Sequence, residues 1–229
     1  MIDIHNHILP HTDDGADDME EAIQMARIAH QDGIRHIIAT PHLNDPVLTG
    51  AEIEKRTAAL NHRLREEAVD VRVYPGAEIP VYLLDNEDYR IGLAGSRYLL
   101  VEFPFTGMLP VTSEIFDHLT GLGYRLVIAH PERNLAVMRN PDVLLNMLTS
   151  DITLQITAGS LTGEMGRDAM SLARYLMKKG TVTYIASDAH DALDRKPELS
   201  PAVKAAGKFL KDRAKSLVEA HPRRILNDD

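Results

Sequence analysis

The sequence of 229 residues predicts an α/β fold with a parallel sheet, open or closed into a barrel. Three observations predict it. Seven apolar segments are typical of strands, and most are separated by segments with helical periodicity. No Gly/Ser-rich linker, low-complexity run or internal repeat divides the chain, so we expect one domain over residues 1–229. Ionisable side chains also gather where the expected strands end, and in a barrel those ends converge on one rim.

The first two strands and the helix between them form a predicted βαβ unit. The chain begins with an apolar strand that places Asp3, His5 and His7 on one face, because side chains alternate along a strand. The carboxylates at 17–21 begin a helix, which an Asp-Gly pair ends. Residues 35–42 then predict a buried strand that ends in a histidine.

The rest of the chain repeats this alternation. A polar segment, 44–50, leads into a long charged helix with an apolar stripe on one side. The later expected strands lie in the segments 71–78, 98–102, 125–130, 152–157 and 182–190. The expected helices after the first cover residues 51–68, 111–122, 140–149 and 164–179.

Composition excludes several classes of protein. The net charge of -9 leaves no basic surface for a nucleic-acid backbone, and 5% aromatic residues with no Trp give few stacking platforms. We therefore expect no nucleic-acid partner. No apolar run is long enough to span a bilayer, and the N-terminus lacks the features of a signal peptide. We expect a cytoplasmic protein without membrane insertion.

The absence of cysteine removes disulfides and any thiolate nucleophile. Catalysis, if present, must use histidine, carboxylates, hydroxyl groups or metal. The chain contains 11 histidines, a count that favours metal binding.

Six of the seven expected strands end in His, Asp or Glu. A single histidine after a strand is often satisfied by backbone groups, but six such ends are hard to explain in that way. Five imidazoles and several carboxylates exceed the needs of one zinc ion, so they predict two or three divalent ions. Without thiolates, this donor set favours Mn, Fe or Zn over Cu(I), and the imidazoles disfavour Ca and Mg. The residues are His5, His7, His42, Glu78, Glu102, His130, Asp188 and His190.

Clustered metal ions activate a bound water and stabilise the attacking and leaving oxygens of an in-line displacement, so the set predicts phosphate ester hydrolysis. Arg133 and Arg195 lie close in sequence to two of the histidines, and a guanidinium matches phosphate oxygens. The alternative for each arginine is a surface salt bridge. Ser187 has no base of its own and is interpreted as structural, as are six histidines in turns, in helices or at a strand start: His11, His30, His36, His62, His118 and His221.

Six short motifs occur in a fixed order through nearly the whole chain. They are Asp3-x-His5-x-His7, Thr40-Pro-His42, Gly76-Ala-Glu78, Glu102-Phe-Pro, Ala129-His-Pro-Glu-Arg133 and Ala186-Ser-Asp-Ala-His190. Together they resemble the motifs of the polymerase and histidinol phosphatase (PHP) superfamily. Within it, the chain is most similar to the manganese-dependent protein-tyrosine phosphatases of bacterial capsule and exopolysaccharide loci.

The resemblance implies the PHP fold, a distorted seven-stranded (β/α) barrel with its site at the C-terminal rim. It implies hydrolysis of phosphotyrosine in proteins by a metal-activated hydroxide. The implied substrate is the tail of a bacterial tyrosine autokinase that controls capsule and exopolysaccharide synthesis. It also implies three divalent metal ions, with Mn²⁺ expected and Fe or Zn as alternatives.

By the same resemblance, Arg133 and Arg195 bind the phosphate, and Asp14 is chosen over the adjacent Asp13 on the family pattern alone. The implied metal ligands are His5, His7, Glu78 and Asp188 for one ion, Glu78, Glu102 and His130 for a second, and Asp14, His42 and His190 for a third.

The chain departs from the family pattern in two places. Asn134 follows Arg133 where an aromatic residue is expected, and the segment 43–50 contains no aromatic residue. Aromatic residues near the rim could stack on a tyrosine ring. The alternative functions are a small-molecule phosphomonoesterase, acting on an ester such as histidinol phosphate, or a phosphodiesterase. A non-enzymatic metal-holding scaffold is disfavoured because the ligand set is complete.

Overall fold

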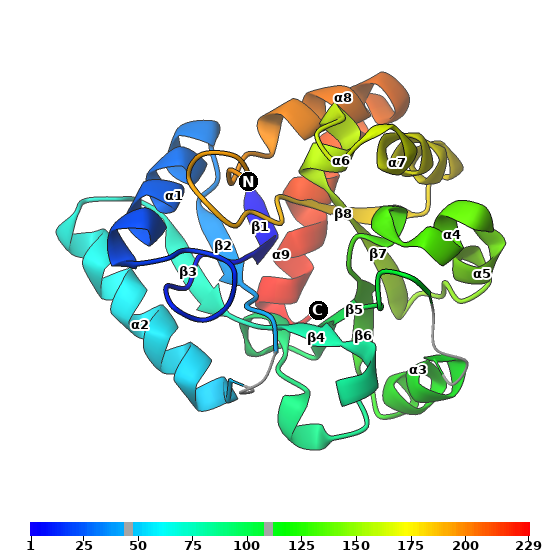
Figure 1. The fold of residues 1–229 in the computed structure, drawn as a ribbon, viewed down its shortest axis with the longest axis horizontal. Coiled ribbons are helices and arrows are strands. Elements are labelled where there is room, and N and C mark those ends of the chain that lie inside the picture. Colours follow the sequence, from blue (N-terminus) through cyan, green and yellow to red (C-terminus); the bar gives the residue numbers. More distant parts are fainter. Residues whose placement is uncertain (44–47, 108–111) are drawn as a thin grey trace.

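The computed structural model describes residues 1–43, 48–107 and 112–229. The strands in these residues form two parallel sheets, in the orders β1-β2-β3 and β4-β5-β6-β7-β8, with helices around the outside (Figure 1). The predicted parallel α/β class is confirmed. The strands are β1 Ile2–Asn6, β2 His36–Ala39, β3 Arg72–Pro75, β4 Glu78–Pro80, β5 Tyr98–Glu102, β6 Arg125–Ile128, β7 Ile152–Thr157 and β8 Val182–Ala186.

Two isolated bridges connect the two sheets. Asn6 at the end of β1 pairs with Ala189 after β8, and His42 after β2 pairs with Glu78 at the start of β4. Both bridges contain or adjoin predicted metal ligands. The two sheets therefore meet where the candidate site lies.

The strand count differs from the prediction of seven, because the expected strand over 71–78 is two strands in two different sheets. β3 pairs with β2, whereas β4 pairs with β5. The chain changes sheets at Gly76, where a Cβ atom would come within 2.9 Å of Ile38 Cγ2. Glu78 consequently begins a strand instead of ending one, so that part of the prediction was wrong. The local pattern shows one extended apolar segment and cannot show the change of pairing partner.

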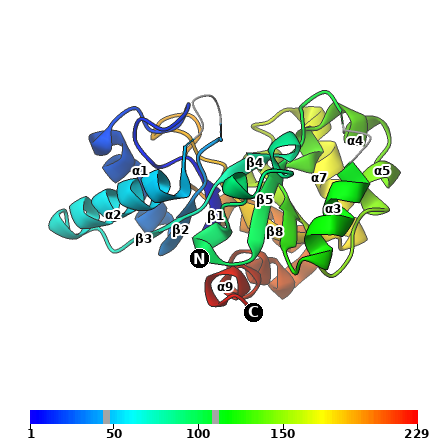
Figure 2. The same cartoon turned by 90° about the horizontal axis from the view of Figure 1, so that it is seen from below.

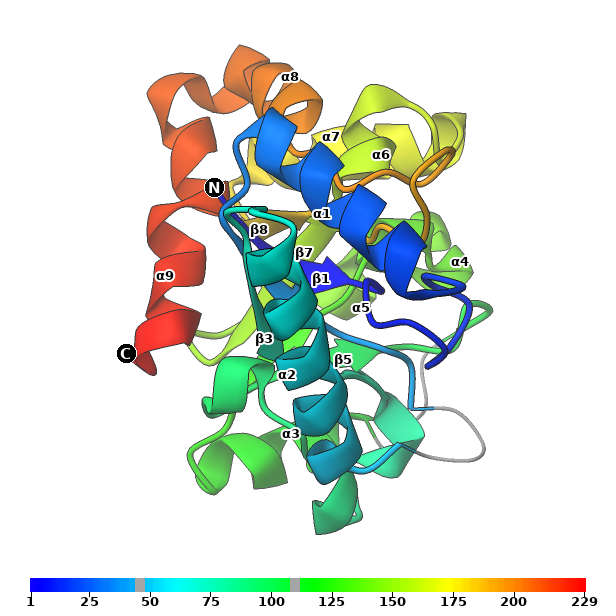
Figure 3. The same ribbon diagram turned by 90° about the vertical axis from the view of Figure 1, so that its left-hand side faces the viewer.

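The first two predicted helices are confirmed with small shifts at their ends. The α1 helix, Met19–Asp32, is capped by Asp18, whose side chain accepts from the Glu21 N–H, and it ends at Gly33 with a φ of 93°. The α2 helix begins with a capping box between Thr49 and Glu52. Figure 3 shows α1 and α2 side by side over the three-stranded sheet. The bounds of α2 are Gly50–Glu66.

The helix predicted over 140–149 is much shorter in the structure, where α5 covers only Asp142–Leu145. Asn140 adopts an extended conformation with a φ of -145°, and Pro141 follows it, so α5 is separate from the short helix α4, which ends at Arg139. The helix predicted over 164–179 begins later, after Gly166, whose φ is 90°. Residue 111 of another predicted helix lies outside the described residues. The helices of this half are α3 Thr112–Gly121, α4 Leu135–Arg139, α5 Asp142–Leu145, α6 Ala158–Thr162 and α7 Arg167–Lys179.

The C-terminal part of the chain adds helices that the sequence pattern did not predict. Figure 2 shows α9 beneath the strands. Ile225 of α9 packs in a buried cluster with Tyr98 and Leu100 of β5. Glu102 follows these two residues at a spacing of two, so the same face of β5 is apolar near α9 and acidic at its carboxyl end. The helices are α8 Ser200–Leu210 and α9 Ala220–Asn227, with 3₁₀ segments at Val81–Leu83, Glu87–Tyr89, Leu93–Gly95, Pro131–Arg133 and Lys211–Val218.

Within the described ranges, no helix has both the length and the apolar character needed to cross a membrane.

Candidate metal centre

The nine predicted metal ligands lie together at one end of the strands. Each belongs to at least one group of side chains whose ligand atoms all lie within 4.8 Å of one another. In the described part of the chain the groups are His5/Glu78/His130, His5/His7/Asp188, His42/Glu78/Glu102 and His7/Asp14/His42/His190. The groups share members, so they form one continuous cluster.

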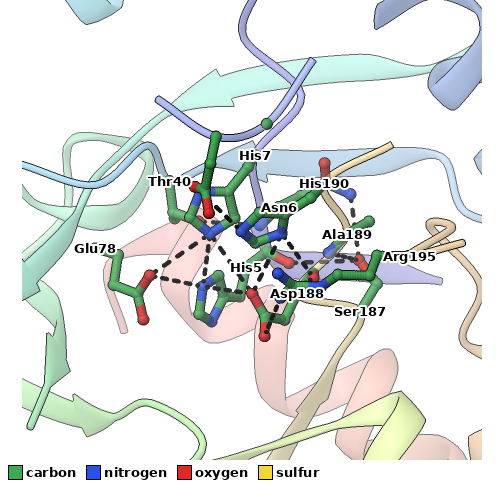
Figure 4. A network of polar contacts seen from close by, with 12 residues as sticks. His5, Asn6, His7, Thr40, Glu78, Ser187, Asp188, Ala189, His190 and Arg195 are labelled. Atoms are coloured by element: carbon green, nitrogen blue, oxygen red, sulfur yellow. Dashed lines mark hydrogen bonds and ion pairs between the residues drawn. The ribbon is translucent and has the colours of Figure 1, made fainter. Parts of the chain in front are cut away.

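The centre of the cluster is the buried pair His5 and His7 (Figure 4). Their Nε2 atoms lie 3.1 Å apart. Glu78 Oε2 is 3.2 Å from His5 Nε2, and Asp188 Oδ1 is 3.4 Å from the same atom. His7 Nε2 is 3.6 Å from Asp188 Oδ1, although 181 positions separate the two residues in the sequence. The predicted convergence of these residues is therefore present.

Glu78 has its two carboxylate oxygens in different surroundings. Oε1 lies 2.7 Å from His130 Nε2, and Oε2 lies 3.0 Å from His42 Nδ1. Glu102 lies further out, with Oε1 4.0 Å from His130 Nε2. Glu78 is fully buried, and its Oε2 makes no hydrogen bond. This position between imidazoles suits a ligand carboxylate shared by two of the groups.

Asp14 and Asp13 have different environments, although they are adjacent. Asp14 Oδ1 lies 3.5 Å from His190 Nε2 and 3.7 Å from His42 Nε2, and the Asp14 side chain is 67% exposed. Asp13 points the other way: its Oδ2 is 2.6 Å from His7 Nδ1 and accepts from the His42 N–H at 2.8 Å. Asp13 therefore contacts the far side of the His7 ring and belongs to none of the four groups.

Sequence reasoning did not predict the role of two residues, Gln155 and Asp3, that hold the ligands in place, although it put Asp3 on the same strand face as His5 and His7. Gln155 Oε1 lies 3.1 Å from His5 Nδ1 and accepts from the His130 N–H at 3.3 Å. Asp3 accepts from the Ser187 N–H at 2.9 Å, directly before Asp188. For Asp3 the signal in the sequence is its spacing of two from His5 on one strand face, and burial of both polar side chains requires hydrogen-bond partners. The structure assigns Ser187 to this supporting network, as the sequence predicted.

The two predicted phosphate-binding arginines both contact Asp188. Arg133 Nη1 is 2.6 Å and Arg195 Nη2 is 2.8 Å from Asp188 Oδ2. Both arginine side chains are partly exposed, at 26% and 29%. They therefore connect the buried cluster to the surface above it. The six histidines interpreted as structural lie outside the four groups; His221, for example, contacts the Thr183 carbonyl.

The cluster is strongly polarised. Burial by itself would raise the pKa of Asp188, but His5, His7 and Arg195 hold it well below its usual range. Burial would lower the pKa of His7, but Asp13, Asp188 and Glu78 raise it well above its usual range. Burial and the neighbouring His7 lower the pKa of His190 to about 4. The Asp188 carboxylate therefore stays ionised at neutral pH.

These features fit divalent metal ions. Imidazole nitrogens face one another at 3.1 Å, and a buried carboxylate oxygen among them has no hydrogen bond. Neutral imidazole and carboxylate ligands with no thiolate are suitable for Mn, Fe or Zn. Hydrogen bonds from the outer nitrogens of His5 and His7 to Gln155 and Asp13 leave both Nε2 atoms directed at the centre.

This chain is similar in sequence to one protein family and to tyrosine-protein phosphatases. The family model described as "Capsular polysaccharide synthesis, CpsB/CapC" matches residues 1–227. The tyrosine-protein phosphatase YwqE of Bacillus subtilis is 41% identical over 201 residues, which cover 85% of this chain and 79% of that protein. The tyrosine-protein phosphatase CpsB of Streptococcus pneumoniae is 30% identical over 241 residues, covering 100% of this chain and 99% of that protein.

A solved structure has a fold similar to that of this chain. It comes from work on YwqE from Bacillus subtilis and CpsB from Streptococcus pneumoniae, which are described as unique metal-dependent tyrosine phosphatases. Its TM-score is 0.94 at 35% sequence identity, and the match covers 100% of this chain and 95% of that one.

Proposed function

Since this chain belongs to the CpsB/CapC family of capsular polysaccharide synthesis, we propose that it is a metal-dependent phosphatase that hydrolyses phosphotyrosine in proteins. The membership confirms the resemblance that the six motifs indicate. The observation that carries the proposal is the convergence of nine His, Asp and Glu side chains next to two arginines. Such a centre suits a phosphate ester, and the relatives named as tyrosine-protein phosphatases favour phosphotyrosine.

We propose that the cluster holds three divalent ions, with Mn²⁺ as the expected metal and Fe or Zn as alternatives. Such ions would supply an activated water and positive charge for the phosphate. The proximity of Asp14 to His42 and His190 supports Asp14 over Asp13 as a ligand. The proposed ligands are His5, His7, Asp14, His42, Glu78, Glu102, His130, Asp188 and His190.

The chain's own residues would bind and orient the ester. Arg133 and Arg195 approach Asp188 from the exposed side, and each guanidinium has further N–H groups for phosphate oxygens. Asp188 would keep both guanidinium groups close to the centre. The buried walls around His5, His7 and Glu78 would exclude bulk water and strengthen these contacts.

The natural substrate that we propose is a bacterial tyrosine kinase of the capsule or exopolysaccharide system, acted on in the cytoplasm. The family's role in capsular polysaccharide synthesis supports this. We further propose that residues 1–229 form one PHP domain and that the two sheets belong to a single distorted barrel. The bridges at Asn6 and His42 support that view.

The function is tested with metal-stripped protein and a phosphotyrosine peptide. Activity should return when Mn, Fe or Zn is added, and Mg should be less effective. No activity with any metal would contradict the proposal. Histidinol phosphate and a phosphodiester are the comparison substrates: a higher kcat/KM for either would favour the alternative function.

Replacing Arg133 with alanine is expected to lower kcat/KM for the phosphotyrosine peptide about tenfold, mainly through KM. A hydrogen bond to a charged group contributes about 1.5–3 kcal/mol, and Arg195 would remain. Steady-state kinetics measure the effect. The control is Arg139→Ala, an exposed arginine at the end of α4. Unchanged kinetics for the Arg133 variant would show that it makes only a surface ion pair.

Metal binding should release protons at neutral pH and weaken as the solution becomes acid. The raised pKa of His7 means that the metal-free ring is protonated near pH 7, and a ligand nitrogen must be neutral. Calorimetric titrations of Mn²⁺ in buffers of different ionisation enthalpy measure the released protons. Affinity should rise with pH from about 6 to 8. A pH-independent affinity over this range would contradict the role of His7.

A further inference from the structure

Phe105 presents a large apolar ring next to the candidate metal centre. It lies in the loop after β5, and its side chain is 60% exposed. It lines a pocket together with Glu102, His130 and Arg133, all three of which belong to the proposed site. Exposed single apolar residues are common, but this ring forms a wall of the entrance to a charged centre.

The loop that carries Phe105 is fixed by hydrogen bonds from a buried side chain. Asn134 Nδ2 donates to the Pro104 carbonyl at 2.9 Å and to the Gly107 carbonyl at 3.0 Å. The N–H of Leu135 donates to the Phe105 carbonyl at 3.1 Å. The backbone is therefore held before, at and after Phe105.

Asn134 also connects this loop to the residue that would bind phosphate. Its Oδ1 caps α4 by accepting from the Ala136 N–H at 2.9 Å, and Asn134 directly follows Arg133. On the other side of Phe105, the buried Phe103 packs on Phe116 with 6.0 Å between ring centroids. Phe105 and Arg133 are thus fixed relative to each other.

We propose that Phe105 is a specificity-determining residue that binds the aryl group of an aryl phosphate, with Asn134 as its positioning residue. The inference rests on the proposed phosphatase function. The aromatic side chain beside Arg133 comes from the neighbouring loop, and Asn134 holds that loop. Stacking on an aryl ring adds a preference that an alkyl group cannot gain.

The test compares the binding of phenylphosphonate and methylphosphonate to Mn²⁺-loaded protein by calorimetry. Neither compound is hydrolysed, so a failure of the proposed hydrolysis stays distinguishable from a failure of this inference. Phe105→Ala is expected to weaken phenylphosphonate binding about 2- to 12-fold and methylphosphonate binding by less than twofold. Phe105→Tyr should retain the preference. Tyr175→Ala, which removes an exposed aromatic residue of α7, is the control.

The role of Asn134 is tested with Asn134→Ser, which keeps a capping oxygen but lacks the amide donors. The phenyl preference should fall as in the Phe105 variant, and the double variant should lose no more than either single variant. A proportional loss for both phosphonates in the Phe105→Ala protein would overturn the inference, as would unchanged binding of both. A full additional loss in the double variant would overturn the positioning role.

Discussion

Glu78→Gln is expected to lower kcat/KM for a phosphotyrosine peptide by more than about 100-fold, with loss of bound metal. Glutamine keeps the shape but loses the charge, and its NH₂ group would face His130 or His42, which contact Oε1 and Oε2 of Glu78. Loss of an outer hydrogen-bond partner alone typically costs about 10–100-fold in metal affinity or activity. Glu78 belongs to two of the candidate metal groups itself, so its loss should cost more.

Elemental analysis of the purified Glu78→Gln protein and a peptide hydrolysis assay measure the two effects. Circular dichroism checks that the variant is folded. The matched control is Glu114→Gln on α3, where the side chain is exposed. A Glu78 variant that keeps its metal and most of its activity would show that the cluster does not depend on this carboxylate.

Asp13→Ala and Asp14→Ala are expected to produce different defects. Asp14→Ala should lose one metal equivalent, because this carboxylate lies beside His42 and His190 in an exposed position. Asp13→Ala should keep the stoichiometry but weaken metal binding about 10–100-fold, since it removes the hydrogen-bond partner of the outer nitrogen of His7.

Without metal, Asp13→Ala should lower the free energy of unfolding more than Asp14→Ala does. Asp13→Ala leaves the partly buried N–H groups of His42 and Gly15 without their acceptor, at a cost of about 1–3 kcal/mol. Asp14→Ala should change the free energy of unfolding by less than about 0.5 kcal/mol. Urea titrations with chelator and Mn²⁺ titrations measure the two quantities. If only the Asp13 variant lost a metal equivalent, Asp13 and not Asp14 would be the metal ligand.

Much of this fold follows from local pattern. The β1-α1-β2 unit, the buried stripe of α2 and the strands β5, β6, β7 and β8 were predictable because periodicity and capping residues act over a few positions. The separate helix α4, the short length of α5 and the late start of α7 after Gly166 were not predicted. The division of residues 71–78 between two sheets depends on pairing with distant strands, which no local pattern records.

Some features of the candidate site likewise follow from the sequence, and others depend on the tertiary structure. The sequence by itself determined which side chains gather, because ionisable residues recur beside the carboxyl ends of strands and match a family pattern in order and spacing. Only the tertiary structure decided how they act on one another. Asp13 and Asp14 are equivalent in the sequence, but the turn closed at Gly15 directs one to His7 and leaves the other beside His190.

The supporting residues depend on the tertiary structure for the same physical reason. Gln155 contacts His5, although 150 positions separate the two residues in the sequence. Asn134 lies after β6 and holds the loop of Phe105, which follows β5. A sequence pattern reports the chemistry and the local conformation of each residue. Hydrogen bonds and packing between distant segments depend on where the chain places both partners, so only the folded protein defines them.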